Sequence, residues 1–177
     1  MNYFELYDIP VKFHPEDAQV KKKFYELSKR YHPDYYANES EGKQQEILEL
    51  STLNNKAYQV LSNPLKRIEY VLSLNNLMEE GDKYRLPQDF LMEMMDVNEK
   101  IMEQEFEPNA MALISIQDEV NDIEKHLFTD LKQFTEAYDN ESDQQHESTL
   151  LEIKDIWYRQ KYLLRIGESL SKFAAHI

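Results

Sequence analysis

A basic run in this chain is followed by His32, Pro33 and Asp34. Of all the residues in the sequence, these have the clearest capacity for chemistry. An imidazole and a carboxylate can both form polar contacts with a partner, and proline fixes the backbone between them. The basic side chains that precede them are Lys22, Lys29 and Arg30. A lone tripeptide is a weak signal, because proline routinely ends helices and aspartate is common in turns. The lysines alone would equally fit an ordinary solvated helix face.

The use of cysteine and histidine excludes several other kinds of site. The chain has no cysteine, which excludes disulfides and cysteine-ligated metals. Its five histidines never cluster at helical ligand spacing, so we predict no metal and no cofactor. A carboxylate-metal enzyme would need paired Glu-x-x-His motifs on facing helices, and the approach of Glu124 to His126 has the wrong spacing. We therefore expect a binding protein without catalytic residues.

Helix signals dominate the part of the chain that must position the tripeptide. A short helix is predicted over 2–7 and another over 65–74. Between them, one long helix begins near Pro15 and is ended by Pro33, and a second follows a polar loop over 35–42. The sequence thus predicts an antiparallel helical hairpin with short flanking helices around one small core.

The first long helix has one apolar and one basic side. Its apolar residues recur every three or four positions: Val20, Phe24, Leu27 and Tyr31. At about 100° per residue, Lys22 and Lys29 lie on the opposite, solvent-facing side, with Arg30 on its flank. The helix therefore presents positive charge next to His32 and Asp34.

A second helical region follows a glycine- and proline-containing break, which we interpret as a linker over 77–87. Three helices are predicted after it, over 88–106, from Asn109 to a turn at 140–148, and over 149–173. The inward residues predicted for the last helix are Leu150, Ile153, Trp157, Leu164 and Leu170. Alternating spacings of three and four are typical of bundle packing. The predicted fold class is all-α, with an N-terminal domain over 1–76 and an antiparallel three-helix bundle over 88–177.

Charge is distributed unevenly between these regions. Residues 1–76 carry 10 Lys and Arg against 11 Asp and Glu, whereas residues 77–177 carry 10 against 23. The strongly acidic second region argues against nucleic-acid binding and suits a partner with a basic patch. No apolar run approaches the roughly 20 residues that span a bilayer. The start of the sequence lacks the basic character of a signal peptide, so we expect a soluble protein of the bacterial cytoplasm.

The first helix of the bundle has more apolar surface than one core stripe requires. Phe90, Met94, Val97 and Ile101 form the core stripe. A second arc holds Leu91, Met92, Met95 and Met102, bordered by Asp96, Glu99 and Glu103. This arc is either a wide core face or an exposed patch with an acidic rim, for which flexible methionines are well suited. The pattern alone does not decide between the two.

The N-terminal region resembles a J domain, the DnaJ-type module that activates heat-shock ATPase chaperones. The resemblance is carried by Tyr3 to Leu6, by Phe24 and Leu27 with Tyr31 to Asp34, by Leu53, Asn54, Ala57, Tyr58 and Leu61, and by Asn63, Pro64, Arg67 and Tyr70. It implies that His32, Pro33, Asp34, Lys22, Lys29 and Arg30 bind the chaperone and promote its ATP hydrolysis. Tyr35 stands where many J domains have lysine, which removes one positive charge from this surface.

The whole chain is similar to the HscB family of iron–sulfur co-chaperones. The opening Asn2-Tyr3-Phe4, the segment from Asn63 to Leu74 and the run from Phe90 to Glu93 carry this closer resemblance. It implies that the bundle binds an IscU-type scaffold protein through Leu91, Met92, Met95, Asp96, Glu99, Glu103 and Tyr158. Met95, Asp96 and Tyr158 are mild departures from the usual Leu, Glu and Phe, and Tyr158 adds a hydroxyl that needs a partner or water.

The resemblance also defines the expected partners and shape. It implies an L-shaped monomer that joins a DnaK/HscA-type chaperone to the scaffold, with no nucleic acid or membrane as partner. The cysteine-rich segment of some eukaryotic relatives is absent, so no metal is carried over. The alternative function is that of a general J-domain co-chaperone for unfolded clients. The absence of a Gly/Phe-rich linker and of zinc repeats counts against that alternative.

Overall fold

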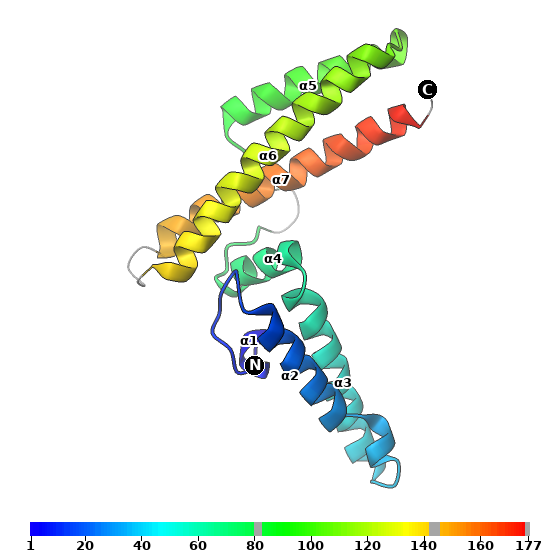
Figure 1. Cartoon of the computed structure of the whole chain (residues 1–177), viewed down its shortest axis with the longest axis vertical. Coiled ribbons are helices and arrows are strands. Elements are labelled where there is room, and N and C mark those ends of the chain that lie inside the picture. The colour runs from blue at the N-terminus through cyan, green and yellow to red at the C-terminus, as the bar shows by residue number, and fades with distance from the viewer. Residues whose placement is uncertain (80–82, 142–145, 176–177) are drawn as a thin grey trace. The chain divides into compact units, whose positions relative to one another are not determined.

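The computed structural model describes residues 1–79, 83–141 and 146–175, and in these ranges the chain forms helices and no strand. The elements are α1 (Tyr3–Leu6), α2 (Asp17–Arg30), the 3-10 helix η1 (Pro33–Tyr36), α3 (Glu41–Leu61), α4 (Pro64–Leu74), α5 (Gln88–Phe106), α6 (Ala110–Asn140) and α7 (His146–Ala174) (Figure 1). They form two compact units, Met1–Asn76 and Leu77–Ile177. None of the described helices has the length and apolar character needed to cross a membrane. The all-α prediction is confirmed.

The first unit is built around α3, which packs against α1, α2, η1 and α4. Figure 1 shows α2 and α3 side by side as the predicted hairpin. Their apolar stripes meet in a core whose buried side chains include Phe4, Tyr7, Phe13, Val20, Leu61 and Leu72. The side chains of Asn2 and Ser40 accept hydrogen bonds from the first turns of α1 and α3. These caps satisfy backbone N–H groups that a helix leaves without partners, and so define where each helix begins.

One polar side chain lies inside this core. Asn54 on α3 is 1% exposed. Its Oδ1 accepts from the Tyr7 hydroxyl at 2.9 Å, and its Nδ2 donates to the Phe24 carbonyl at 3.1 Å and to Ser28 Oγ at 3.0 Å. Burial raises the pKa of the Tyr7 hydroxyl far above its ordinary value, which keeps the phenol protonated and able to donate. One amide therefore joins the end of α1 to α2 and α3, with its hydrogen bonds made inside the core.

Two side chains of α4, Arg67 and Tyr70, attach this last helix of the unit through polar contacts. Arg67 on α4 is 5% exposed, and its Nε donates to the Phe13 carbonyl at 2.6 Å while its Nη1 donates to the Leu61 carbonyl. The Tyr70 hydroxyl accepts from the Tyr3 backbone N–H at 3.0 Å, and the two tyrosine rings stack at 4.6 Å. A buried guanidinium is tolerated because carbonyl oxygens replace its lost water. These contacts attach α4 to α1, to α3 and to the loop before α2.

The second unit is the predicted three-helix bundle, in which each of α5, α6 and α7 packs against the other two. Its core is formed by Phe90, Met94, Val97 and Ile101 of α5, by Ile116, Val120, Leu127 and Leu131 of α6, and by Leu150, Ile153, Trp157, Leu163 and Leu170 of α7. Most inward positions predicted for α7 are buried. The apolar periodicity of three and four therefore located most of this core.

One predicted core position in α7 is wrong. Leu164 is 52% exposed, whereas Leu163 is 4% exposed. Ile156 and Trp157 are both buried, and the buried seam continues seven residues on from Ile156 to Leu163. The prediction instead extended the seam from Trp157. When two adjacent residues are both buried, the apolar repeat of seven can be continued from either of them. The sequence does not show which continuation is right, because this depends on how the helix packs.

Some boundaries also differ from prediction. α2 begins at Asp17, two residues after Pro15, and α7 begins at His146, three residues earlier than expected. Apolar periodicity reveals that a helix exists but does not locate its end within a turn. The predicted turn over 140–148 lies partly outside the described residues, as do part of the segment over 77–87 and the last two residues of the chain.

Replacing Asn54 with leucine tests the buried amide. Asn54→Leu leaves Tyr7, Phe24 and Ser28 without this partner, so we expect it to destabilise the first unit by about 2–4 kcal/mol. Urea unfolding followed by far-UV circular dichroism measures the loss. The fluorescence of Trp157, the single tryptophan, reports the second unit and should keep its midpoint. The exposed neighbour Asn55→Leu is the control, and equal stability of the two variants would contradict the role given to the amide.

Candidate functional site

The tripeptide begins where α2 ends. The last residue of α2 is Arg30, and Tyr31 is its C-cap. His32 has an extended backbone, with φ −71° and ψ 122°, because the following proline disfavours the helical region. Pro33 then occupies the first position of η1, where its missing N–H costs nothing. Pro33 thus starts a short helical turn, whose last two residues, Tyr35 and Tyr36, fall where a polar loop over 35–42 was expected.

The start of η1 orients the two polar side chains. His32 Nδ1 accepts a hydrogen bond from the Asp34 backbone N–H at 3.3 Å and lies 3.7 Å from Asp34 Oδ2. The side chains of His32 and Asp34 are 53% and 87% exposed. An imidazole and a carboxylate are therefore presented together to solvent from a defined backbone turn.

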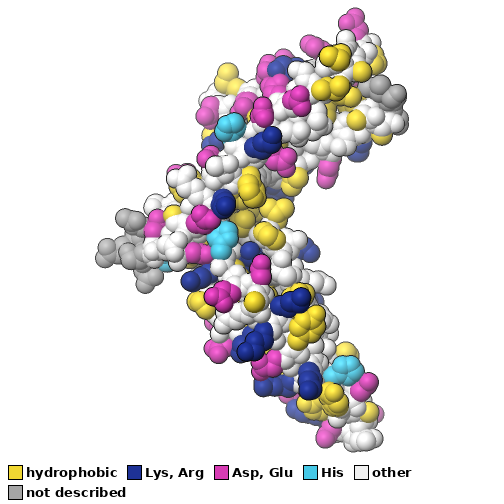
Figure 2. Space-filling view, in the orientation of Figure 1, with side chains coloured by type: hydrophobic (Ala, Val, Ile, Leu, Met, Phe, Trp, Pro, Cys, Tyr) yellow, Lys and Arg dark blue, Asp and Glu magenta, His cyan; other side chains and the backbone are white. Residues whose placement is uncertain are grey.

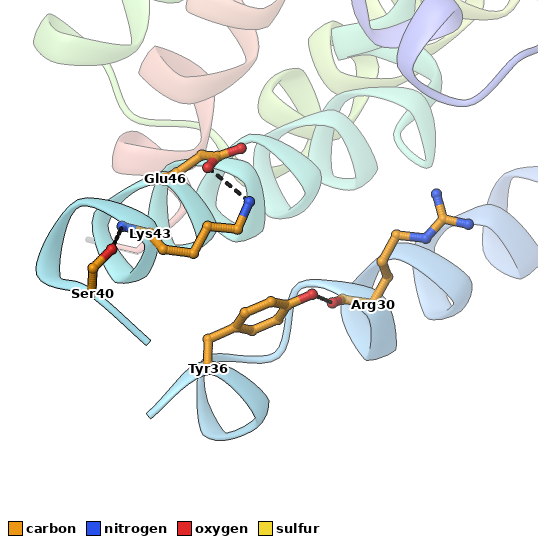
Figure 3. A network of polar contacts seen from close by, with 5 residues as sticks. All are labelled: Arg30, Tyr36, Ser40, Lys43 and Glu46. Atoms are coloured by element: carbon orange, nitrogen blue, oxygen red, sulfur yellow. Dashed lines mark hydrogen bonds and ion pairs between the residues drawn. The ribbon is translucent and has the colours of Figure 1, made fainter. Parts of the chain in front are cut away.

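Polar contacts lie on both sides of η1, and one of them attaches it to the end of α2 (Figure 3). The Tyr36 hydroxyl donates to the Arg30 carbonyl at 3.0 Å and so ties η1 back to the end of α2. At the start of α3, Ser40 Oγ accepts from the Lys43 backbone N–H at 3.3 Å, and Lys43 Nζ lies 2.8 Å from Glu46. The hydrogen bond to Glu46 raises the pKa of Lys43. Tyr36 was not among the residues predicted from the sequence, where its only signal was a tyrosine three residues after a helix-starting proline.

The basic side chains predicted to accompany the tripeptide are all exposed: Lys22, Lys29 and Arg30. Figure 2 shows lysine and arginine side chains gathered over α2. Arg30 Nη2 lies 3.5 Å from Glu26 Oε1, with both side chains largely in water. Such exposed pairs contribute little, so they do not prevent Arg30 from binding another carboxylate. The structure thus brings the basic face of α2 and the tripeptide together.

The second predicted surface lies on α5, and the structure decides between the two alternatives left open by its sequence. The core stripe is buried, with Phe90 at 3% and Met94 at 0% exposure. The second arc is exposed, with values of 37% for Leu91, 63% for Met92, 61% for Met95 and 58% for Met102. It is therefore an apolar surface patch and not a wider core face.

Acidic residues border this patch, and one of them, Asp96, pairs with a lysine that also contacts α6. Asp96, Glu99 and Glu103 are all exposed. Lys100 Nζ lies 3.0 Å from Glu119 of α6 and 3.1 Å from Asp96. Its hydrogen bonds to Glu119 and then to Asp96 raise the pKa of Lys100, so this amine stays charged and holds the rim of α5 against α6. Glu99 and Glu103 remain as negative charges beside the apolar patch.

Tyr158 does not have the exposed position expected of a contact residue. Only 8% of it is exposed. Its hydroxyl accepts from the Glu79 backbone N–H at 2.9 Å, and its ring stacks on Tyr84 at 4.3 Å. The hydroxyl thus has the partner that the sequence required, supplied by the segment before α5. This segment covers most of Tyr158, so little of this side chain is accessible to a partner.

The described parts of the segment over 77–87 are attached to α7 by further contacts that the sequence analysis missed. Lys154, which is 9% exposed, places Nζ 2.9 Å from Glu79 Oε1 and 5.3 Å from the centre of the Tyr84 ring. The Tyr84 hydroxyl donates to Asp155 Oδ1 at 2.7 Å. Burial, and next this hydrogen bond, raise the pKa of Tyr84. Tyr84 stands among polar residues and belongs to no apolar repeat, so its own surroundings in the sequence do not predict that it is packed. The one hint of this contact in the sequence was Lys154, a lysine on the apolar side of α7.

No group of three or more potential metal ligands occurs within the residues that the structure describes. Both surfaces carry exposed groups that can bind a protein partner. One surface offers exposed positive charge with an imidazole and a carboxylate, and the other offers apolar side chains with a negative rim. Each suits a protein partner of opposite character.

The two units match two family models. Residues 2–70 match the DnaJ domain, and residues 86–171 match the HSCB C-terminal oligomerisation domain. Helical hairpin, tripeptide and bundle thus define a J-domain protein with an added helical domain.

Curated relatives agree with this class. The co-chaperone protein HscB homolog of Vibrio cholerae is 33% identical over 135 residues, which cover 75% of this chain and 78% of the relative. The homolog of Vibrio vulnificus is 39% identical over 104 residues, and there the chain spans 61% of the relative's length. The chain belongs to the HscB co-chaperone family.

Solved structures are similar as well. Human co-chaperone protein HscB has a TM-score of 0.73 at 25% identity, covering 100% of this chain and 84% of that one. Chaperone HscB from Vibrio cholerae has a TM-score of 0.59 at 27% identity, covering 96% of this chain and 99% of that one. The likeness therefore extends over both helical units.

Replacing Tyr158 with phenylalanine tests its role in holding the segment before α5. Tyr158→Phe retains a ring to stack on Tyr84 but removes the acceptor for the Glu79 N–H. We expect a loss of about 1 kcal/mol in the stability of the second unit, measured by urea unfolding with Trp157 fluorescence. Tyr162→Phe, on the same helix, is the control. A Tyr158→Phe protein as stable as this control would show that the hydroxyl contributes nothing.

Proposed function

We propose that this HscB-family chain acts in iron–sulfur cluster biogenesis as an adaptor between two proteins. Its J domain stimulates ATP hydrolysis by a DnaK/HscA-type chaperone in the cytoplasm. Its bundle binds an IscU-type scaffold protein and delivers it to that chaperone. The chain acts as a monomer, contributes no catalytic residue, and holds no metal or cofactor of its own.

The chaperone contact is supported by the geometry at the end of α2. His32 and Asp34 are exposed on a turn that Pro33 and Tyr36 hold in place. The exposed lysines and Arg30 on α2 add positive charge, which speeds association with an acidic surface and orients it. The ATP-hydrolysing groups belong to the chaperone, and the J domain supplies only binding energy that favours its active conformation.

The observation that carries the proposal is the exposed apolar arc of α5 beside its buried core stripe. A bundle needs the stripe for folding, but it gains nothing from leaving Leu91, Met92 and Met95 in water. Such side chains are suited to a partner's apolar surface, and Asp96, Glu99 and Glu103 to its basic residues. Tyr158, by contrast, is covered, so we leave it out of the proposed contact.

Neutralising Asp34 tests the chaperone contact. Asp34→Asn keeps the shape of the turn but removes a charge that a basic chaperone residue would pair with, so we expect stimulation to fall about tenfold or more. The measurement is the steady-state ATPase rate of the chaperone, with scaffold affinity expected to be unchanged. Glu39→Gln, which also removes an exposed negative charge in the loop after η1, is the matched control. Full stimulation by Asp34→Asn would remove the tripeptide from the proposal.

Truncating the apolar arc tests the scaffold contact. Leu91→Ala with Met95→Ala removes two side chains that the partner would bury, so we expect binding to weaken by about 2–4 kcal/mol. Calorimetry with the IscU-type scaffold measures this, with ATPase stimulation in the absence of scaffold as a readout that should not change. Leu151→Ala with Leu164→Ala, two exposed leucines of α7, is the control.

Two outcomes would contradict the proposed scaffold contact. Unchanged affinity in the α5 variant would show that the arc is not the binding surface. Capture of denatured polypeptides by the wild-type bundle as efficiently as capture of the scaffold would instead favour a general J-domain co-chaperone.

A further inference from the structure

Phe106, the last residue of α5, is 81% exposed, more than any other large hydrophobic residue in the described part of the chain. Burying a phenylalanine side chain stabilises a protein, and this exposed ring contributes no such stabilisation here. Single exposed hydrophobic residues are normal on protein surfaces. Phe106 is not single, because it continues a stripe of exposed side chains along α5.

The stripe follows from helical geometry. At about 100° per residue, four residues fall within roughly 60° of one another on the outer side of α5: Leu91, Met95, Met102 and Phe106. Their exposed fractions are 37%, 61%, 58% and 81%. From Leu91 to Phe106 the stripe is about 22 Å long at 1.5 Å per residue. The anchors of the proposed scaffold contact occupy only its first half, and the stripe continues in line with them to the end of the helix.

Charge indicates what the second half of the stripe would bind. α5 carries six acidic residues and one lysine, and that lysine is paired with Asp96 and Glu119. The exposed Glu103, Glu105 and Glu107 lie around the turn that carries Phe106. A second copy of the chain would bring like charges together on this face. A partner with an apolar seat bordered by lysine or arginine would satisfy both the aromatic ring and the carboxylates.

We propose that the scaffold docks along the whole outer face of α5, with Phe106 and Met102 as a second anchor beyond Leu91 and Met95. This inference rests on the proposed function and deepens it. The matching surface of the scaffold is an apolar seat that takes the Phe106 ring and is flanked by basic side chains. Aromatic side chains that fill a pocket on the partner often contribute most of the binding energy of an interface.

The test is Phe106→Ala, alone and with Met102→Ala, measured for affinity and dissociation rate with the IscU-type scaffold. We expect the single variant to raise Kd about tenfold and the double variant more, mostly through faster dissociation. Phe128→Ala is the matched control, because Phe128 is a 62% exposed phenylalanine of α6 and lies outside the stripe. All three variants should keep the urea unfolding midpoint of the wild type, because surface substitutions rarely change stability much.

The outcomes separate this inference from the function on which it rests. If Leu91→Ala with Met95→Ala weakens binding while Phe106→Ala does not, the docking surface ends before Phe106 and only the extension is wrong. If the wild-type chain does not bind the scaffold, both the proposed function and the extension are wrong. If Phe106→Glu abolishes a concentration-dependent self-association by sedimentation but leaves scaffold affinity unchanged, the stripe is a contact between copies and the extension is overturned.

Discussion

The buried amide of Asn54 fixes the frame on which the N-terminal site depends. It binds α1, α2 and α3 at once, so the two long helices of the hairpin cannot slide along each other without breaking a hydrogen bond inside the core. Just beyond the C-terminal end of α2, Pro33 sets the backbone of His32, and the Tyr36 hydroxyl donates to the Arg30 carbonyl. A rigid hairpin and a fixed turn together hold the tripeptide in one geometry, which lowers the entropy that a partner must remove on binding.

The surfaces on α2 and α5 both attract a partner by charge, but the charges of the two surfaces have opposite signs. The exposed lysines and Arg30 make α2 positive on a unit that is nearly neutral in total, whereas α5 places its negative charges on a strongly acidic region. Charge of either sign acts over about 8–10 Å at physiological salt and therefore selects the partner before close contact forms. At close range the surfaces differ, because α2 offers polar groups for directional bonds and α5 offers apolar area.

Sequence periodicity predicted a large part of this structure for a physical reason. Helices with one apolar stripe must bury that stripe, so spacing alone located the core of α5 and separated it from the exposed arc at Leu91 and Met95. Periodicity did not predict which of two adjacent leucines, Leu163 or Leu164, is buried. It also could not predict contacts between segments that lie far apart in the sequence. The cover that Glu79 and Tyr84 form over Tyr158 is such a contact, since nothing in the local pattern of either segment specifies the other. The residues that we propose as contacts on α2 and α5 are exposed, and for the α5 arc the sequence alone had left this undecided.

The exposed arc of α5 has a chemical consequence that leucine in its place would not bring. Met92, Met95 and Met102 present their thioethers to solvent, and the chain contains no cysteine that would be oxidised before them. Addition of one oxygen turns a methionine into a polar, chiral sulfoxide, which enzymes can reduce again. Oxidants would therefore make the exposed face of α5 polar. The bundle would stay folded, because Met94, its core methionine, is fully buried and so protected from oxidation.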